Sequence, residues 1–290
     1  MIIQAFLAII SLLATLLICA GFGRLILRAF APKHAGGLEG FLFAAAIGMG
    51  ALSYLILALG LIGLLYPTAV LILMLALMLV SRRNLSRGEA SASASDTMRG
   101  IIGQMLHPYI GIPIAVIGVS ALIGALAPPS FNDWDALAYH LAVPSLYIKW
   151  HAIKYVPFTS HSNLPFLMEM LYAIGLLFPA LGGAALAKLF HFAAGVLTVL
   201  AIYVIGKKHF SPKAGAIGAA VFAAIPLVGW EATAGYIDLA TSFYVVLAVL
   251  ALLNHWDEGG QWGVLAFISL GLAAATKTTA LAFIPVAGLW

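Results

Sequence analysis

Ionisable and hydrogen-bonding side chains gather in one segment of an otherwise apolar chain. Residues 128–163 read PPSFNDWDALAYHLAVPSLYIKWHAIKYVPFTSHSN. Asp133 and Asp135 lie two positions apart, directly after an apolar run. Carboxylates at this spacing can share a cation, or one can act as a base beside another that stays charged. His140, His161 and Asn163 are further candidates for binding a substrate or a metal ion, whereas the aromatic residues between them are typical of a membrane interface.

A second polar cluster, WEATAGYIDLATSF, contains Glu231, Tyr236 and Asp238. Asp238 directly precedes an apolar run. An acid at that depth is expensive in a membrane, and it suits two roles equally, a cap for the helix that begins at Leu239 or a ligand for substrate or metal. With Asp133 and Asp135, it leaves open a divalent metal site.

Two lysines interrupt apolar sequence. Lys277 stands in GLAAATKTTALAFIPV, where it either extends to the membrane interface or binds an anion such as a lipid phosphate. Lys188 and His191 are three residues apart, so they share a helix face and can flank the same pocket. Glu169, alone in PFLMEMLYAIGLLF, is a further candidate for the site, although the favoured interpretation is that it faces water.

Composition limits the elements that can position these groups. The 290 residues are 63% hydrophobic and 8% charged, with mean hydropathy +1.09, which excludes a soluble enzyme and predicts an all-α polytopic membrane protein. The formal charge of +4 is too dispersed for a nucleic-acid-binding surface. Zinc-type HxxH and HExxH spacings, a GxSxG nucleophile motif and glycine-rich phosphate loops are all absent from the sequence. The expected apolar spans are 2–23, 41–65, 67–80, 110–127, 184–206, 214–230, 239–253, 264–276 and 278–290.

Basic residues predict the orientation. Arg24, Arg28 and Lys33 form one cluster, Arg82 to Arg99 a second, and Lys207 to Lys213 a third, and all three should be cytoplasmic. The run 164–179 then cannot cross the membrane. We expect it to lie as an interfacial helix within one large external loop, residues 128–183, with the amino terminus outside. The predicted organisation is a three-span leader at 1–85, a cytoplasmic linker at 86–105 and a catalytic module at 106–290.

The order of WDALAYH, NLPFLMEMLYAIGLLF, GKKHF, GYIDLA and GLAAATKTTALAFIP resembles bacterial family 39 glycosyltransferases. These are membrane enzymes of the GT-C superfamily, related to protein O-mannosyltransferases and to the lipid A aminoarabinose transferase. The resemblance covers residues 110–290 and implies a GT-C-like transmembrane bundle whose large first external loop carries interfacial helices. It also implies further spans, so the chain is expected to be incomplete at its carboxy terminus.

The resemblance implies roles for several residues. Asp135 takes the position of the catalytic base or metal-site carboxylate, and Ala136 replaces the glutamate that usually follows, so Asp133 becomes the candidate partner. Asp238 matches the acid of the second external turn. Lys277, with Lys188 as a second cation, is expected to contact the phosphate of the donor.

The implied reaction is inverting transfer of a sugar from a polyprenyl-phosphate donor to a lipid, glycan or protein acceptor. The implied location is the periplasmic face of the bacterial inner membrane, among membrane lipids and without nucleic acid. A transporter or flippase for a lipid-linked or anionic substrate is the alternative, since intramembrane charge also marks transport pathways. A noncatalytic scaffold subunit is a third hypothesis, which the missing Asp-Glu pair favours.

Overall fold

A computed structural model describes residues 2–29, 36–85 and 108–288. These residues form helices and connecting turns, with no strand among them, which confirms the all-α membrane class that the composition predicts. The predicted linker at 86–105 lies outside the described residues. The longer helices are α1 (Ile2–Leu27), α2 (Gly37–Leu61), α3 (Pro67–Leu85), α5 (Pro108–Leu126), α8 (Ala184–His209), α9 (Pro212–Ala223), α11 (Asp238–Glu258) and α12 (Trp262–Thr276).

Shorter helices fill the connections. Between α5 and α8 the chain forms a π-helix, η1 (Ala136–His140), then α6 (Ala142–Trp150), η2 (Ser160–Asn163), α7 (Leu167–Leu177) and η3 (Pro179–Leu181). The helix α10 (Pro226–Glu231) precedes α11, and η4 (Thr278–Ala282) and α13 (Phe283–Gly288) follow α12.

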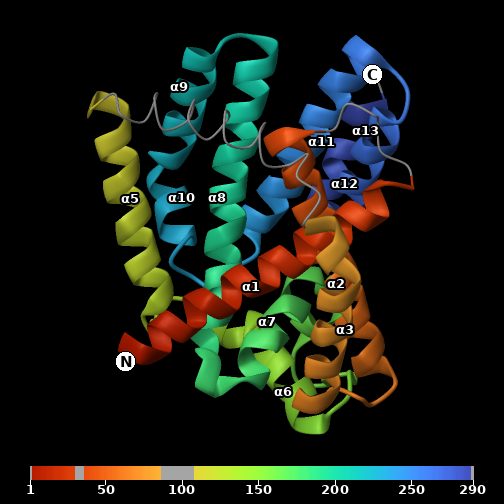
Figure 1. Ribbon diagram of the computed structural model, residues 1–290. Helices are drawn as coiled ribbons and strands as arrows, with labels where there is room; N and C mark the ends of the chain where they lie inside the picture. Colours follow the sequence, from red (N-terminus) through yellow and green to blue (C-terminus); the bar gives the residue numbers. More distant parts are fainter. Residues whose placement is uncertain (1, 30–35, 86–107, 289–290) are drawn as a thin grey trace.

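The upright helices alternate in direction, as Figure 1 shows for α5, α8 and α9, while α1 crosses the bundle obliquely. The end of α5 and the start of α8 therefore lie at one end of the bundle, together with α6 and α7. We call this the loop end. The carboxy-terminal end of α8, whose last turn carries Lys207 and Lys208, lies at the opposite, basic end (Figure 1).

Four helices, α1, α2, α8 and α11, are long and apolar enough to cross a membrane, and α3, α5 and α12 are shorter apolar helices. The expected single span at 214–230 is instead two helices, α9 and α10. Pro226 has no backbone N–H and displaces the preceding Ile225 from the helical region, to φ −65° and ψ 120°. The chain is thus interrupted shortly before Glu231.

The helix α7 differs from the interfacial helix that we expected at 164–179. Its eleven residues span about 16 Å, too short to cross a hydrocarbon core of about 30 Å. However, all its side chains except Leu176 are buried, because α7 packs against α2, α6 and α8. An interfacial helix would keep a polar face in water. The prediction that Glu169 faces water is therefore wrong, since this side chain is fully buried.

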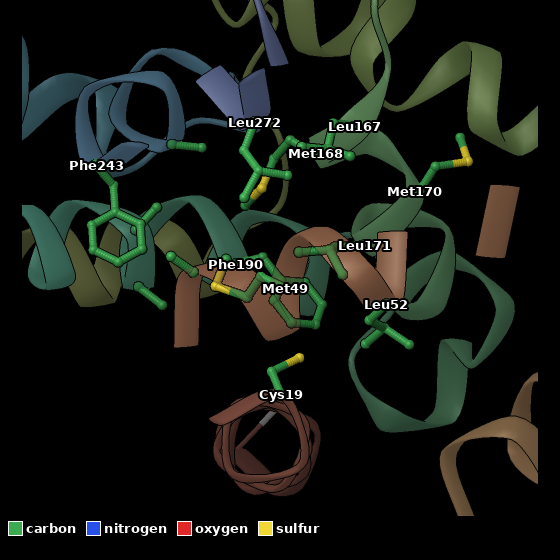
Figure 2. Packing of buried hydrophobic residues seen from close by; sticks show 14 of the residues in the cluster. Cys19, Met49, Leu52, Leu167, Met168, Met170, Leu171, Phe190, Phe243 and Leu272 are labelled. Atoms are coloured by element: carbon green, nitrogen blue, oxygen red, sulfur yellow. The ribbon is translucent and has the colours of Figure 1, made fainter. Parts of the chain in front are cut away.

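The principal core joins the amino-terminal helices to the rest of the bundle. Cys19 of α1 points toward Met49 of α2 and Phe190 of α8, as Figure 2 shows, and all three are buried. Glycines let α1 and α2 approach closely, because a Cβ atom at Gly48 would lie 1.8 Å from the carbonyl oxygen of Cys19. The helices α1 and α2 thus share one packed core with the helices that carry the candidate site.

Candidate functional site at the loop end

The first acid of the loop, Asp133, shapes the backbone that follows α5. Its Oδ2 atom accepts a hydrogen bond from the backbone N–H of Ser130 at 2.9 Å, and its carbonyl accepts one from Leu137 at 3.0 Å. The side chain is buried. Asp133 thus ends the turn and starts the helical segment that carries Asp135, which is a positioning role.

Asp135 is half-buried and contacts two tyrosines. The Tyr139 hydroxyl, one helical turn later, interacts with its carboxylate. Burial, reinforced by the Asp135 carboxylate, raises the pKa of the Tyr139 hydroxyl. The Tyr236 hydroxyl interacts with the backbone of Asp135, which brings the first loop beside the segment before α11. Asp135 therefore lies beside two tyrosines and remains within reach of solvent, as a general base requires.

The third acid of the loop region, Glu169, pairs with His140. The Nδ1 atom of His140 lies 2.6 Å from Oε1 of Glu169, and both side chains are almost completely buried. This contact joins η1 to α7 across 29 residues of sequence. The structure therefore brings together two candidates that the sequence left unconnected.

Aromatic rings pack beside this pair. The Tyr139 and His161 rings are stacked, with centroids 4.5 Å apart and planes at 11°. Trp134 meets both rings edge-on and is 61% exposed. His161 is held by η2, whereas Asn163, at the end of η2, is exposed to solvent. The interface interpretation of these aromatics thus fits Trp134 better than Tyr139, which is buried.

Lys277 and Asp238 form an ion pair at the start of α11. Nζ of Lys277 lies 2.5 Å from Oδ1 of Asp238, and about two fifths of each side chain is exposed. Asp238 makes no side-chain cap for its own helix, so the structure gives it an ionic partner in place of the predicted capping role. Nearby Glu231 is buried, and one of its carboxylate oxygens has no hydrogen-bond partner among the described residues. Burial, with Asp238 as a like charge, raises the pKa of Glu231 to about 7, against a smaller opposing effect of Lys277.

Lys188 and His191 form hydrogen bonds with backbone groups next to the candidate site. Nζ of Lys188 donates to the carbonyl oxygens of Gly124 and Ala127, each at 2.9 Å, and so neutralises the carboxy-terminal end of α5. The His191 ring contacts the Ala234 carbonyl oxygen at 3.1 Å through Nδ1 and accepts from the Leu239 N–H at 2.9 Å through Nε2. His191 therefore fixes the segment that contains Tyr236 and Asp238.

A polar cavity of about 90 Å³ lies between Tyr139, the His140–Glu169 pair and Lys277. Its polar lining comes from the stacked Tyr139, from the buried pair, and from Lys277 with the threonines beside it. The full lining is Tyr139, His140, Leu164, Pro165, Glu169, Ile237, Thr276, Lys277, Thr278 and Thr279. On the other face of the Tyr139 and His161 stack, His161, Trp134 and Phe158 line an open hollow.

A separate apolar cavity of about 210 Å³ lies between α5, α8, α9, α10 and α11. Its lining includes Phe192, Ala232 and Leu239, which stand next to the helix ends that carry the site. The remaining walls are aliphatic side chains and glycines, with Tyr203 as an aromatic exception. An apolar chain is the kind of ligand that such walls accept.

The three acids considered for a metal site do not form one here. Among residues 2–29, 36–85 and 108–288, no group of three or more His, Cys, Asp or Glu side chains is arranged to hold a metal ion. Asp133 is engaged with backbone, and Asp238 is paired with Lys277. The donor set present therefore does not fit a resident divalent cation.

The sequence did not single out Tyr139, Thr278 or Thr279 as site residues. Tyr139 follows Asp135 by four residues, and that helical spacing was a usable signal. The threonines directly follow Lys277, but their position in the cavity depends on how α12 meets α7. Of the predicted residues, Asp135, Tyr236, Glu169, His140, His161, Asp238 and Lys277 converge at the loop end.

Comparison with known proteins identifies part of the chain. Residues 165–290 match the family model described as dolichyl-phosphate-mannose-protein mannosyltransferase. Glu169, Lys188, Glu231, Asp238 and Lys277 lie inside the matched range, whereas Asp133, Asp135 and His140 precede it. No curated protein and no solved structure matches the chain. The family match confirms the resemblance that the motifs indicated.

Proposed function

We propose that this chain, a membrane glycosyltransferase of the GT-C type as the family match supports, moves a sugar from a polyprenyl-phosphate donor to an acceptor hydroxyl. The observation that carries the proposal is that a partly exposed carboxylate, Asp135, and a cation, Lys277, lie at the same end of the bundle, with Lys277 and Tyr139, the neighbour of Asp135, both lining a polar cavity. Glycosyl transfer needs these two groups. A base takes the proton of the attacking hydroxyl, and a cation stabilises the departing phosphate.

The donor would span two cavities. Its polyprenyl tail fits the apolar cavity between α5, α8 and α11, and its phosphate and sugar would occupy the polar cavity beside Lys277. Lys188 is a weaker candidate for the phosphate, because its ammonium group already binds two carbonyl oxygens. The ammonium group of Lys277 is more accessible, since that side chain is 37% exposed.

The acceptor would approach from the open hollow that Trp134, Phe158 and His161 line. Its hydroxyl oxygen attacks the anomeric carbon from the face opposite the phosphate, and the bond from that carbon to the phosphate oxygen breaks. The acceptor proton passes to the Asp135 carboxylate, and polyprenyl phosphate leaves beside Lys277. Attack from the opposite face inverts the configuration of the anomeric carbon.

The site groups lie at one end of the bundle, which favours one-sided chemistry over transport. The preference of basic residues for the cytoplasmic side supports an orientation with this end outside, because Lys207 and Lys208 are at the other end of α8. We therefore propose that transfer takes place at the periplasmic face.

Transfer of radiolabelled sugar in membranes that contain the protein tests this proposal. The donors are undecaprenyl phosphates that carry mannose, glucose, galactose or a pentose, and Asp135→Asn is compared with the wild type. An enzyme should lose transfer in the variant yet still bind donor. A transporter should move donor across liposome membranes without cleaving it. A scaffold should do neither, and either of these last results would refute the proposal.

A further inference from the structure

Glu169 and His140 form a buried pair that the proposed proton and phosphate transfers do not use. Nδ1 of His140 lies 2.6 Å from Glu169, and Glu169 is fully buried within α7. The second oxygen of Glu169, Oε2, is enclosed and has no hydrogen-bond partner among the described residues. Burying a carboxylate with an unpaired oxygen is costly, so a role beyond stability would account for its presence.

The pair fixes the orientation of the imidazole ring. When the Glu169 carboxylate is ionised, Nδ1 of His140 carries the hydrogen that it donates, and Nε2 is the atom left for another partner. In the part of the chain that the structure describes, no group hydrogen-bonds Nε2 of His140. His140 and Glu169 both line the polar cavity. The pair is therefore a preoriented polar group at the wall of the proposed donor site.

The charges around the cavity favour a neutral, hydroxyl-rich ligand at this wall. A phosphate placed beside Glu169, away from Lys277, would meet a carboxylate of the same sign. The hydroxyls of Thr278 and Thr279 and the ring of Tyr139 complete the wall. Hydroxyl partners together with an aromatic face suit a sugar ring, in which polar edges alternate with apolar faces.

We infer that His140, held in place by Glu169, hydrogen-bonds one hydroxyl of the transferred sugar and so selects which sugar the protein accepts. This inference rests on the proposed function, because it assumes that the polar cavity holds the sugar of a lipid-linked donor. His140 is then the contacting residue, and Glu169 is a positioning residue.

A double-mutant cycle, in which deoxy donors are combined with protein variants, tests this contact. Binding and kcat/KM are measured with undecaprenyl-phosphate hexoses, and then with the monodeoxy analogues of the sugar that binds best. Loss of the matched hydroxyl should cost the wild type about 10- to 100-fold in affinity, the size of one hydrogen bond to a preoriented polar group. In His140→Gln, removal of the same hydroxyl should lower the affinity less than about threefold, because the variant has already lost the contact to that hydroxyl.

Two further variants separate positioning from folding. Glu169→Gln keeps an oxygen near Nδ1 and should retain part of the selectivity, whereas Glu169→Leu should lose it. His151→Gln is the matched control, because the His151 ring stacks on Tyr66, with ring centroids 3.9 Å apart, and does not line the polar cavity. Undecaprenyl phosphate without a sugar should bind all correctly folded variants equally.

The outcomes separate a failure of this inference from a failure of the proposed function. If every deoxy donor loses the same factor in His140→Gln as in the wild type, His140 does not contact the sugar and the inference is wrong, while the proposed function stands. If the folded wild type binds no sugar-bearing lipid at all, the proposed function and this inference both fail. If only Glu169→Leu loses binding of sugar-free undecaprenyl phosphate, the pair acts through the fold alone, which also overturns the inference.

Discussion

Glu231 offers a quantitative prediction, because its carboxylate is 8% exposed at the loop end and its pKa is raised to about 7. In an unfolded chain the same group titrates near 4.5. At about 1.4 kcal/mol per pH unit, this difference corresponds to a cost of about 3 kcal/mol for the ionised carboxylate in the folded protein. Because the folded state holds the proton more tightly, stability falls as the pH rises from about 4.5 to about 7 and is level above that range.

The variant Glu231→Gln keeps the shape of the side chain but cannot ionise. We expect its free energy of unfolding to match that of the wild type near pH 4.5 and to exceed it by about 3 kcal/mol at pH 8. Unfolding in mixed detergent micelles at a series of pH values measures this difference. Asp257→Asn is the control, because that carboxylate is 54% exposed at the basic end.

Parallel stability profiles for the wild type and Glu231→Gln from pH 4.5 to 8 would refute the reasoning. They would mean that solvent or a cation relieves the ionised carboxylate in the folded protein. A profile in which the wild type gains stability as the pH rises would reverse the sign and would place Glu231 in a favourable ion pair.

Three further results follow from the packing and the topology. Gly48→Ala should lower the free energy of unfolding in mixed micelles by about 1 to 3 kcal/mol or more, because its Cβ atom would meet the Cys19 carbonyl. Gly271→Ala is the control and should be neutral or slightly stabilising, because the space around Gly271 is open. Lys188→Met should cost about 2 to 4 kcal/mol, because the Gly124 and Ala127 carbonyls lose their donor, and an unchanged unfolding midpoint would instead mark the ammonium group as dispensable for the fold. A membrane-impermeant maleimide should label Ser160→Cys in intact spheroplasts and Ser211→Cys only after lysis, and the reverse pattern would overturn the orientation.

The sequence predicted the parts of the fold that depend on composition and local pattern. Long apolar runs gave the positions of α1, α2, α8 and α11, since the number of residues needed to cross a membrane is set by its thickness. The break at Pro226 was missed, although proline supplies a local signal for it. The burial of α7 was missed for a different reason. Its neighbours α2 and α8 come from distant sequence, and only their packing shows that the helix has no face in water.

Residues of the candidate site could be picked out from the sequence, but their pairings could not. Asp135, Asp238 and Lys277 stood out because charged groups are expensive beside apolar runs. The sequence could not show that Lys277 pairs with Asp238 or that Glu169 pairs with His140, because these contacts join segments 39 and 29 residues apart. It also assigned Lys188 to the donor, although the α5 carbonyls take up its charge.

The most direct test of the central claim is the rate at which the purified protein releases undecaprenyl phosphate from a lipid-linked sugar in the presence of acceptor. We expect the wild type to release undecaprenyl phosphate and transfer sugar in equal amounts, and Asp135→Asn to lose about 10²- to 10⁴-fold in rate with donor binding retained. Asp257→Asn should match the wild type. Undiminished release by a correctly folded Asp135→Asn would contradict the assignment of Asp135 as the base.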